Sequence, residues 1–379
     1  MKPKAYSSWR RGLGGKKPLE SRFPTERLRK LREALEGLKL EGYLVFHPAN
    51  IHYFTGSQQA GELSQALLIT PDSAILFLPE MGAYQVSREL KAKVDLEVSR
   101  VGEEALTRLR KAVQAFKLLG FDDASQARLT KLRVGGVKLK AHPEIAEGLR
   151  MVKDEGEIRA MRKAASILKR GFRAVLNVLK PGIREFEVAA EAEYALRMGG
   201  SDFYAFPSLV ASGGRSAYPH GPPTSRKLRR GDVVVVDLGA RFSGYCVDAT
   251  RTFLIGEAKP TVLKAYQAVL EAYKMAAGRV RPGMSGSEAD EYARRLLQAR
   301  GFGEAFTHGL GHGVGLEVHE APRLSPSSRD LLKAGSTFTL EPGVYLPGRF
   351  GIRVEDTFLL AEDGVKPLTG WVEKETLLV

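Results

Sequence analysis

Cysteine is nearly absent from this sequence: Cys246 is the only one among 379 residues. A single thiol cannot form an internal disulfide, and it cannot supply the cysteine cluster of a zinc finger. The sequence also lacks any apolar run close to the ~18–20 residues that a membrane helix needs, so a membrane-spanning protein is excluded. Acids are in deficit, because 58 lysines and arginines against 44 acids leave a net charge of +14. Such a charge suits an anionic partner, although a solvated basic surface produces the same excess.

The sequence also lacks a secretory signal, the motif of a serine hydrolase and the motif of a P-loop protein. The first 22 residues carry six basic residues before their first acid, Glu20. A secretory signal would add an apolar stretch of about 7–15 residues, and none follows. We interpret residues 1–22 as a basic flexible tail, with a transit peptide as the alternative, and expect a cytoplasmic protein. No Gly-x-Ser-x-Gly elbow and no P-loop occur, which argues against a serine hydrolase and a P-loop protein.

The remaining sequence divides into two parts, as its length suggests, since a domain typically has ~100–150 residues. In residues 23–152, helical and strand-like patterns alternate. Three- and four-residue steps separate the leucines of a predicted amphipathic helix, Leu28, Leu31, Leu35 and Leu38. The short apolar runs GYLVFHP, QALLIT and AILFLP predict strands of a covered sheet. Such alternation predicts a small α/β domain.

Residues 153–379 predict a second, larger domain of the α+β class. Helical patterns that end near a glycine or a Pro-Gly pair run over residues 153–179, 184–200, 260–279 and 285–300. Strand patterns lie between and after them, at residues 232–239, 245–255, 336–346 and 351–360. The candidate functional residues lie in this second domain.

Three of the seven histidines lie in one glycine-rich stretch, HGLGHGVGLEVHE. Its four glycines make a poor helix, so the four-residue spacing of His308 and His312 does not describe a helix face. His319 opens a sequence like the zinc-protease helix motif, but Arg323 stands where the second histidine of that motif should be. Taken singly, each of these histidines is more typical of a packed or surface residue than of a ligand.

Four acids, however, lie inside or at the ends of predicted buried strands: Asp237, Asp248, Glu341 and Glu355. Ionised carboxylates are rarely buried without a partner. Ion pairs with some of the many arginines would account for them separately. The alternative is one oxygen-rich metal site, in which two divalent cations neutralise the formal charge of −4. With one imidazole added, this ligand set suits a two-metal hydrolytic centre better than a tetrahedral zinc site.

Four segments, DLGARFSGYCVDATRTF, HGLGHGVGLEVHE, EPG and RVED, follow one another in an order that resembles a known family. This is the pita-bread-fold metallopeptidase family, which includes methionine aminopeptidase, aminopeptidase P and prolidase. The resemblance implies a pita-bread catalytic domain over residues 153–379. ANIHYFTG more weakly resembles the creatinase-type N-terminal α/β domain, here residues 23–152. The metal ligands that the family pattern implies are Asp237, Asp248, His312, Glu341 and Glu355.

The resemblance also implies cofactors and catalytic roles. It implies two divalent metal ions, with manganese expected first and cobalt or zinc as alternatives, bridged by a hydroxide that attacks the peptide bond. Glu341 would also act as the general base. His220 and His319 would orient the substrate and stabilise the oxyanion. The substrate-binding residues that the pattern implies are His308, Arg323, Arg353 and Phe206.

These substrate-binding residues resemble the proline-directed branch of the family. We therefore expect hydrolysis of the bond between an N-terminal residue and a following proline, in short peptides. Arg353, and Arg323 with it, favour an Xaa-Pro dipeptidase (prolidase) over aminopeptidase P, because a guanidinium can bind a substrate carboxylate bidentately. The alternatives are a methionine-aminopeptidase-like enzyme and a non-catalytic binding protein of the same fold. A homodimer is expected from the related enzymes.

Two further expectations come from composition. The basic residues are spread through both parts without a basic–aromatic pattern, which argues against nucleic acid as a partner. There are 34 arginines against 24 lysines, and only two asparagines. Scarce thermolabile residues and abundant arginine predict a heat-stable protein, although a GC-rich genome would give the same bias. Cys246, between two of the acids, is expected to be a small buried apolar residue.

Overall fold

The computed structural model describes residues 22–101, 103, 107–122 and 135–370. The basic tail expected at residues 1–22 therefore lies outside the described residues, except for its last position. The chain divides into two compact units, Met1–Arg150 and Met151–Val379. None of the described helices combines the length and apolarity that crossing a membrane requires.

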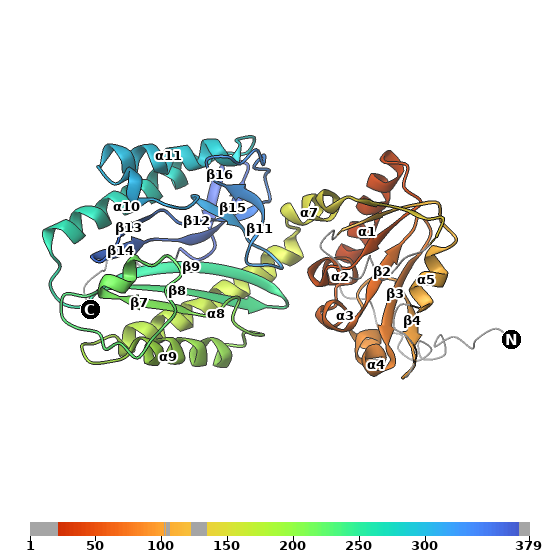
Figure 1. The fold of residues 1–379 in the computed structure, drawn as a ribbon, viewed down its shortest axis with the longest axis horizontal. Helices are drawn as coiled ribbons and strands as arrows, with labels where there is room; N and C mark the ends of the chain where they lie inside the picture. Colours follow the sequence, from red (N-terminus) through yellow and green to blue (C-terminus); the bar gives the residue numbers. More distant parts are fainter. Residues whose placement is uncertain (1–21, 102, 104–106, 123–134, 371–379) are drawn as a thin grey trace. The chain divides into compact units, whose positions relative to one another are not determined.

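The first unit is built on a six-stranded mixed sheet with the strand order β4-β3-β2-β1-β5-β6 (Figure 1). Its strands are β1 (Gly42–Val45), β2 (Ala66–Ile69), β3 (Ala74–Pro79), β4 (Asp95–Ser99), β5 (Leu118–Phe121) and β6 (Lys138–Ala141). Its helices are α1 (Arg22–Gly37), α2 (Pro48–Thr55), α3 (Gln58–Leu63), α4 (Glu80–Glu89), α5 (Thr107–Val113) and α7 (Pro143–Met151). Strands β1 and β2 are buried along their whole length, as expected for a covered sheet.

The leucine pattern of α1 is confirmed for three of its four positions. Leu28, Leu31 and Leu35 are buried, whereas Leu38 is 46% exposed. The expectation for Leu38 was wrong because α1 ends at Gly37, so the helical period no longer directs the next side chain to the core.

The second unit contains three sheets and two pairs of helices. Its strands are β7 (Leu209–Ser212), β8 (Val233–Phe242), β9 (Tyr245–Leu254), β10 (Gly311–Gly313), β11 (Glu320–Leu324), β12 (Thr337–Leu340), β13 (Gly343–Leu346), β14 (Phe350–Arg353), β15 (Asp356–Ala361) and β16 (Gly364–Pro367). The sheet orders are β7-β8-β9, β11-β10-β12-β15-β16 and β13-β14. The sheets are antiparallel throughout.

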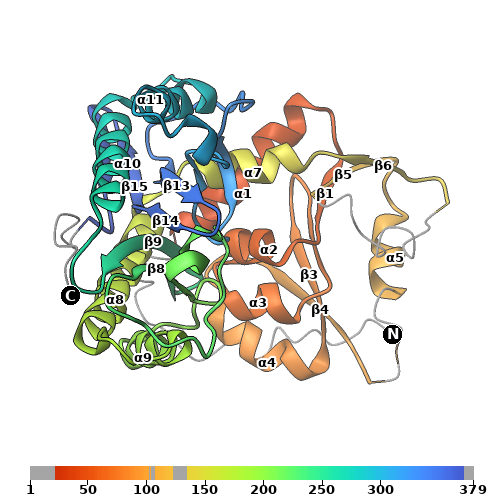
Figure 2. The same cartoon turned by 60° about the vertical axis from the view of Figure 1, so that its left-hand side comes forward.

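The helices of this unit are α8 (Glu155–Val178), α9 (Glu185–Met198), α10 (Pro260–Arg279) and α11 (Gly286–Ala299), with the short 3-10 helices η3 (Gly213–Ala217) and η4 (Gly303–Ala305). All four predicted long helices are thus confirmed. Helices α8 and α9 lie side by side, with α8 against β8 and β9 and α9 against β7, while α10 and α11 form a second pair near β12 to β14 (Figures 1 and 2). The strands that carry the polar residues are therefore held between two helical layers.

A tight turn joins β8 to β9. Phe242 pairs with Tyr245, which leaves a two-residue loop of Ser243 and Gly244. Both loop residues have positive φ, 50° and 82°. Two positive φ values are what a type I′ turn requires, and this turn matches the right-handed twist of a hairpin. The pairing of the two strands is fixed by this loop.

Two segments predicted as single strands are in fact broken. Residues 336–346 form β12 and β13, which belong to different sheets, and the break falls at Glu341 and Pro342. Proline has no N–H to donate to a sheet, so the ladder stops there. Residues 351–360 likewise divide into β14 and β15, and at their break the N–H of Glu355 donates to Thr250 O, 3.1 Å away. The two breaks lie at Glu341 and Glu355, which are two of the four acids that the sequence patterns indicate as candidate ligands.

Candidate metal centre

The β8–β9 hairpin brings the two aspartates together. Asp237 pairs with Thr250, and Asp248 pairs with Gly239. Paired residues of an antiparallel ladder have their side chains on the same face, as do residues two apart along a strand. Both aspartate side chains therefore lie on one face of the hairpin, and the two residues are only 7% and 4% exposed.

His312 is held by a short strand between two longer ones. Strand β10 pairs with β11 on one side and β12 on the other. A Cβ at Gly311 would lie 2.0 Å from Thr339 O, and one at Gly313 would lie 2.2 Å from Ala321 O. Only glycine allows this close backbone approach. The glycines that argued against a helix thus allow β10 to bring His312 to the aspartates.

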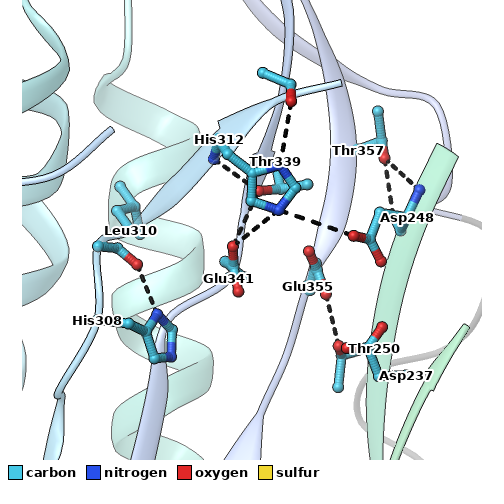
Figure 3. Close-up of polar contacts among 12 residues, drawn as sticks. Asp237, Asp248, Thr250, His308, Leu310, His312, Thr339, Glu341, Glu355 and Thr357 are labelled. Carbon is cyan, nitrogen blue, oxygen red and sulfur yellow. Dashed lines mark hydrogen bonds and ion pairs between the residues drawn. The ribbon is translucent and has the colours of Figure 1, made fainter. Parts of the chain in front are cut away.

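The two glutamates approach from the strand breaks. Glu341 donates its N–H to Leu310 O at 2.8 Å, beside β10. Glu355 accepts a hydrogen bond from Thr250 Oγ1 at 2.6 Å and is 1% exposed. The side chains of Asp248, His312, Glu341 and Glu355 converge from β9, β10 and the two breaks (Figure 3).

Distances within this cluster are those of possible ligands to a common ion. His312 Nε2 lies 3.3 Å from Glu341 Oε1 and 3.9 Å from Asp248 Oδ2. Asp248, His312 and Glu355 each offer one ligand atom, and these three atoms lie within 4.8 Å of one another. Asp237 contributes a carboxylate on the same face of the hairpin.

Burial and mutual repulsion govern the electrostatics. Burial, followed by the neighbouring carboxylates, raises the pKa of Asp248 and of Glu355 well above their ordinary values. Burial also raises the pKa of Glu341 to about 8. Burial, with the nearby His319 second, lowers the pKa of His312 to about 3, so its imidazole is neutral and able to bind a metal. The carboxyl groups of Asp248, Glu341 and Glu355 therefore do not all ionise here unless cations accompany them.

Three oxygens in the cluster fit such cations directly. Asp237 Oδ1, Asp248 Oδ1 and Glu355 Oε1 are buried and have no hydrogen-bond partner among the described residues. Buried polar atoms are nearly always satisfied, so three such oxygens in one cluster indicate a missing partner. Carboxylate oxygens with one neutral imidazole are ligands suited to hard or borderline divalent cations. The residues present therefore fit a pair of divalent metal ions.

The other three predicted histidines are not equivalent. The ring of His319 lies edge-on to that of His312, with centroids 4.2 Å apart and an angle of 73° between the rings. His308 is partly buried, with Nε2 3.0 Å from Tyr345 Oη and Nδ1 2.7 Å from Gly309 O, away from the cluster (Figure 3). His220 is exposed on the loop after η3.

Arg353 is more deeply engaged than the sequence suggested. It is 3% exposed, and its guanidinium donates to Asp237 Oδ2 at 2.6 Å. The remaining acceptors of the guanidinium are Thr250 Oγ1, Tyr345 Oη and Pro219 O, at 3.0, 2.8 and 3.1 Å. Four donor–acceptor contacts occupy most of its five N–H groups. Little of this arginine remains for a substrate carboxylate.

Phe206 and Arg323 lie at the edges of the site. Phe206 packs on Gly239, where an added Cβ would lie 2.5 Å from the phenyl ring. This glycine pairs with Asp248, so the ring borders the face that carries the aspartates. Arg323 pairs with His312 on the neighbouring strand, its side chain is exposed, and its N–H donates to Asp330.

Two family models match the chain. The model described as metallopeptidase family M24 matches residues 159–362. The creatinase/prolidase N-terminal domain matches residues 27–152. The chain belongs to metallopeptidase family M24. The resemblance drawn from the four ordered segments, and the pita-bread fold that it implied, are thereby confirmed.

Relatives of this M24 chain match along nearly its whole length. A curated protein from Pyrococcus furiosus, named Xaa-Pro dipeptidase, is 36% identical over 352 residues, which cover 93% of this chain and 99% of the relative. The structure of an Xaa-Pro dipeptidase from Bacillus anthracis covers 94% of this chain and all of its own, with 31% identity and a TM-score of 0.87. The structure of an X-Pro aminopeptidase from Thermotoga maritima covers 91% of this chain and all of its own, with 34% identity and a TM-score of 0.82.

The M24 site also contains polar residues that the sequence patterns did not single out. Thr339 Oγ1 accepts the N–H of His312 and lies 3.3 Å from Glu341 Oε1. Thr357 Oγ1 binds both the N–H and the carbonyl of Asp248. The alternation of threonines in STFTLE was the available signal for Thr339, since period-two polar residues share one face of a strand.

Proposed function

We propose that this chain hydrolyses the bond between an N-terminal residue and a following proline, with Xaa-Pro dipeptides as the preferred substrates. The observation that carries the proposal is the buried cluster of carboxylates around His312, with its three unpartnered oxygens. Relatives named Xaa-Pro dipeptidase support the proline specificity.

The proposed ligands are Asp237, Asp248, His312, Glu341 and Glu355. Two divalent ions bound by these five residues would lower the pKa of a water molecule and so supply a nucleophile near neutral pH. We propose manganese, because oxygen-rich ligand sets suit it, with cobalt or zinc as the alternatives.

Glu341 is the proposed general base. In the metal-free protein, burial raises the pKa of its carboxyl group to about 8, and bound cations would favour the ionised form that accepts a proton. It would accept a proton from the attacking water and return it to the departing proline nitrogen. His319 and His220 would donate N–H groups to the oxyanion of the tetrahedral intermediate.

Proline in the second position explains why a specialised enzyme is needed. Its imide nitrogen has no N–H, and its ring fixes φ near −65°. Peptidases that bind an extended strand through backbone N–H groups therefore fit such a substrate badly. A metal site that binds the scissile carbonyl does not depend on the missing N–H.

A second candidate is cleavage of longer Xaa-Pro peptides, as the name of the Thermotoga maritima relative describes. The contacts of Arg353 favour this second candidate, because a guanidinium bound to Asp237, to two hydroxyl oxygens and to one carbonyl oxygen is poorly placed to select a free dipeptide carboxylate. Arg323, being exposed, is the remaining arginine that could make this selection.

The homodimer and the cytoplasmic location expected from the sequence stay predictions. A methionine-aminopeptidase-like activity is disfavoured, because the match to a creatinase/prolidase N-terminal domain is typical of the proline-directed branch. A non-catalytic role is disfavoured by the five intact candidate ligands.

The decisive experiment compares metals and substrates in one matrix. Metal-stripped protein is reconstituted with Mn²⁺, Co²⁺ or Zn²⁺ and assayed with Ala-Pro, Ala-Pro-Ala and Met-Gly-Ala. Cleavage of Ala-Pro above Ala-Pro-Ala supports the dipeptidase, and the reverse order supports the aminopeptidase. The proposed function would be refuted if only Met-Gly-Ala were cleaved, or if none of the three peptides were cleaved.

A further inference from the structure

The loop that carries His220 is tied down at both ends by one buried carboxylate. This loop, residues 213–223, begins after β7 with η3 and returns toward the start of α9. His220 is exposed near its end. An exposed histidine on a free loop would sample many positions, so its usefulness depends on what holds the loop.

Glu185, the first residue of α9, is fully buried. Its Oε1 accepts hydrogen bonds from Ser212 N at 2.8 Å and Ser212 Oγ at 2.7 Å, immediately before the loop. Its Oε2 accepts from Thr224 N at 3.0 Å and Thr224 Oγ1 at 2.6 Å, immediately after the loop. Oε2 also accepts from the guanidinium of Arg215, within the loop. One carboxylate thus joins the two ends and the interior of the same loop.

The backbone of α9 reinforces this closure. The N–H of Phe186 donates to Thr224 O at 3.1 Å, so the loop end satisfies one of the unpaired N–H groups of the helix start. Arg215 Nη2 donates to Pro222 O at 2.8 Å, which links the beginning of the loop to its end. Arg215 therefore both balances the buried charge of Glu185 and shapes the loop.

The loop also contacts strand β14, whose Arg353 binds the metal-centre residue Asp237. Ser216 Oγ accepts the N–H of Gly351 at 2.8 Å. Pro219 O, the carbonyl next to His220, accepts from Arg353, which also donates to Asp237. His220 is thus attached to the site through its preceding peptide, while Glu185 holds the rest of the loop.

We propose that Glu185 is a positioning residue for His220, an inference that rests on the proposed function. Its ionised carboxylate accepts five hydrogen bonds and offers none, which matches a site lined only by donors. A glutamine would direct its amide group at one of those donors, so one loop end would be released. Because a displacement of about 1 Å can cost 10²-fold in rate, release of the loop should reduce turnover.

The test is a double-mutant cycle on the full metal-loaded chain with an Xaa-Pro substrate. Glu185→Gln should lower kcat by about 10- to 100-fold with the metal content unchanged. In the His220→Ala background the same substitution should lower kcat less than about two-fold, because the histidine it positions is gone. Glu191→Gln on the exposed side of α9 is the matched control and should stay within about two-fold of the wild type.

A second readout does not need activity. Hydrogen–deuterium exchange of residues 213–223 should become faster in Glu185→Gln and stay unchanged in Glu191→Gln. Thr224→Val, which leaves Glu185 ionised, should give a smaller change in the same direction, and it replaces Glu185→Gln in the cycle if that variant fails to fold. Equal losses in both backgrounds, or unchanged exchange, would overturn the proposal. If the wild type cleaves no Xaa-Pro substrate, the proposed function fails, while the exchange measurement still decides whether Glu185 holds the loop.

Discussion

At the scale of single residues, His312 and His319 differ in their contacts. His312 Nε2 lies beside Glu341 and Asp248, whereas the exposed His319 touches the edge of the His312 ring. A ligand and an oxyanion donor should respond differently to truncation. His312→Ala should lose bound metal. His319→Ala should keep its metal and lose about 10²- to 10³-fold in kcat, as is usual when an oxyanion donor is removed.

Metal content by mass spectrometry and kcat on the same preparations separate the two cases. His142→Ala, in the first unit, is the matched control and should change neither. The interpretation would be wrong if His312→Ala bound two ions per chain as tightly as the wild type.

His308 should make the second unit sensitive to acid. Burial, followed by the charge of Arg353, lowers its pKa from 6.5 to about 4. Below pH 6.5 the unfolded chain therefore binds a proton that the folded chain does not bind until about pH 4. The contribution of His308 to the free energy of unfolding is fully present above pH 6.5. It falls by about 3 kcal/mol as the pH approaches 4, since one pKa unit corresponds to about 1.4 kcal/mol.

His308→Gln, which can keep the contact with Tyr345, should remove this loss. Urea unfolding of the metal-free wild type and variant at several pH values between 7 and 4 gives the comparison. The free energy of unfolding of the variant should depend less steeply on pH, by a slope that corresponds to at most one proton. Identical slopes for wild type and variant would count against the assignment.

Motifs in the sequence identified the residues that converge in the structure, but not their partners. Asp237 and Asp248 follow from a short hairpin, so their proximity is readable from local pattern. Arg353 and Asp237 are 116 positions apart, and no local pattern indicates that they form an ion pair. The same holds for Glu185, whose five donors come from one loop and its two ends, which lie 27 to 39 positions further along the chain.

At the scale of elements, helices were easier to predict than strands. Asp154 with Glu157 caps α8, and Ser285 with Glu288 caps α11, so both helix starts carry a local signal. The strand patterns at 336–346 and 351–360 continue through Glu341 and Glu355, and a strand pattern alone does not show where one sheet ends and the next begins. Glu341 and Glu355 stand at these breaks, and their side chains enter the cluster there.

A buried ion pair links the start of α8 to the start of β11. Lys153 Nζ lies 2.8 Å from Glu320 Oε1, and the two side chains are 1% and 7% exposed. Lys153→Met would leave this carboxylate buried without its cation, which typically costs about 3–5 kcal/mol. Adding Glu320→Gln should recover part of that loss, because the uncompensated charge is removed.

Urea unfolding of the single and double variants tests this expectation, with the exposed Lys333→Met as a control that should stay near the wild type. A double variant no more stable than Lys153→Met would show that the charge is not the source of the loss.

At the scale of the whole molecule, bound cations should raise stability. Ions that bind only the folded chain add about 2.7 kcal/mol when their free concentration is 100 times Kd. The three raised carboxyl pKa values give the physical reason, since cations relieve the repulsion among these groups. Calorimetry of stripped protein with and without excess Mn²⁺ should show a higher Tm with the metal. An unchanged Tm at full metal occupancy would contradict this account.

Composition predicts a heat-stable chain. Two asparagines, one cysteine and an excess of arginine over lysine leave few thermolabile positions. We expect a Tm above the range of ~45–65 °C that is typical of mesophilic domains. A thermal scan of the metal-loaded protein measures it, and a Tm inside that range would disprove the expectation.

The turn at Ser243 and Gly244 also governs how the site tolerates insertions. The pairing of the two strands, and not the count of eleven positions, holds Asp237 and Asp248 on one face. Residues added at the exposed Ser243 would lengthen that interval and leave both carboxylates in place. Deletion of one residue between Gly239 and Phe242 would instead turn Asp237 to the opposite face. The eleven-residue interval therefore records the length of a loop, and homologues with longer loops would carry the same pair at intervals that a fixed-spacing search overlooks.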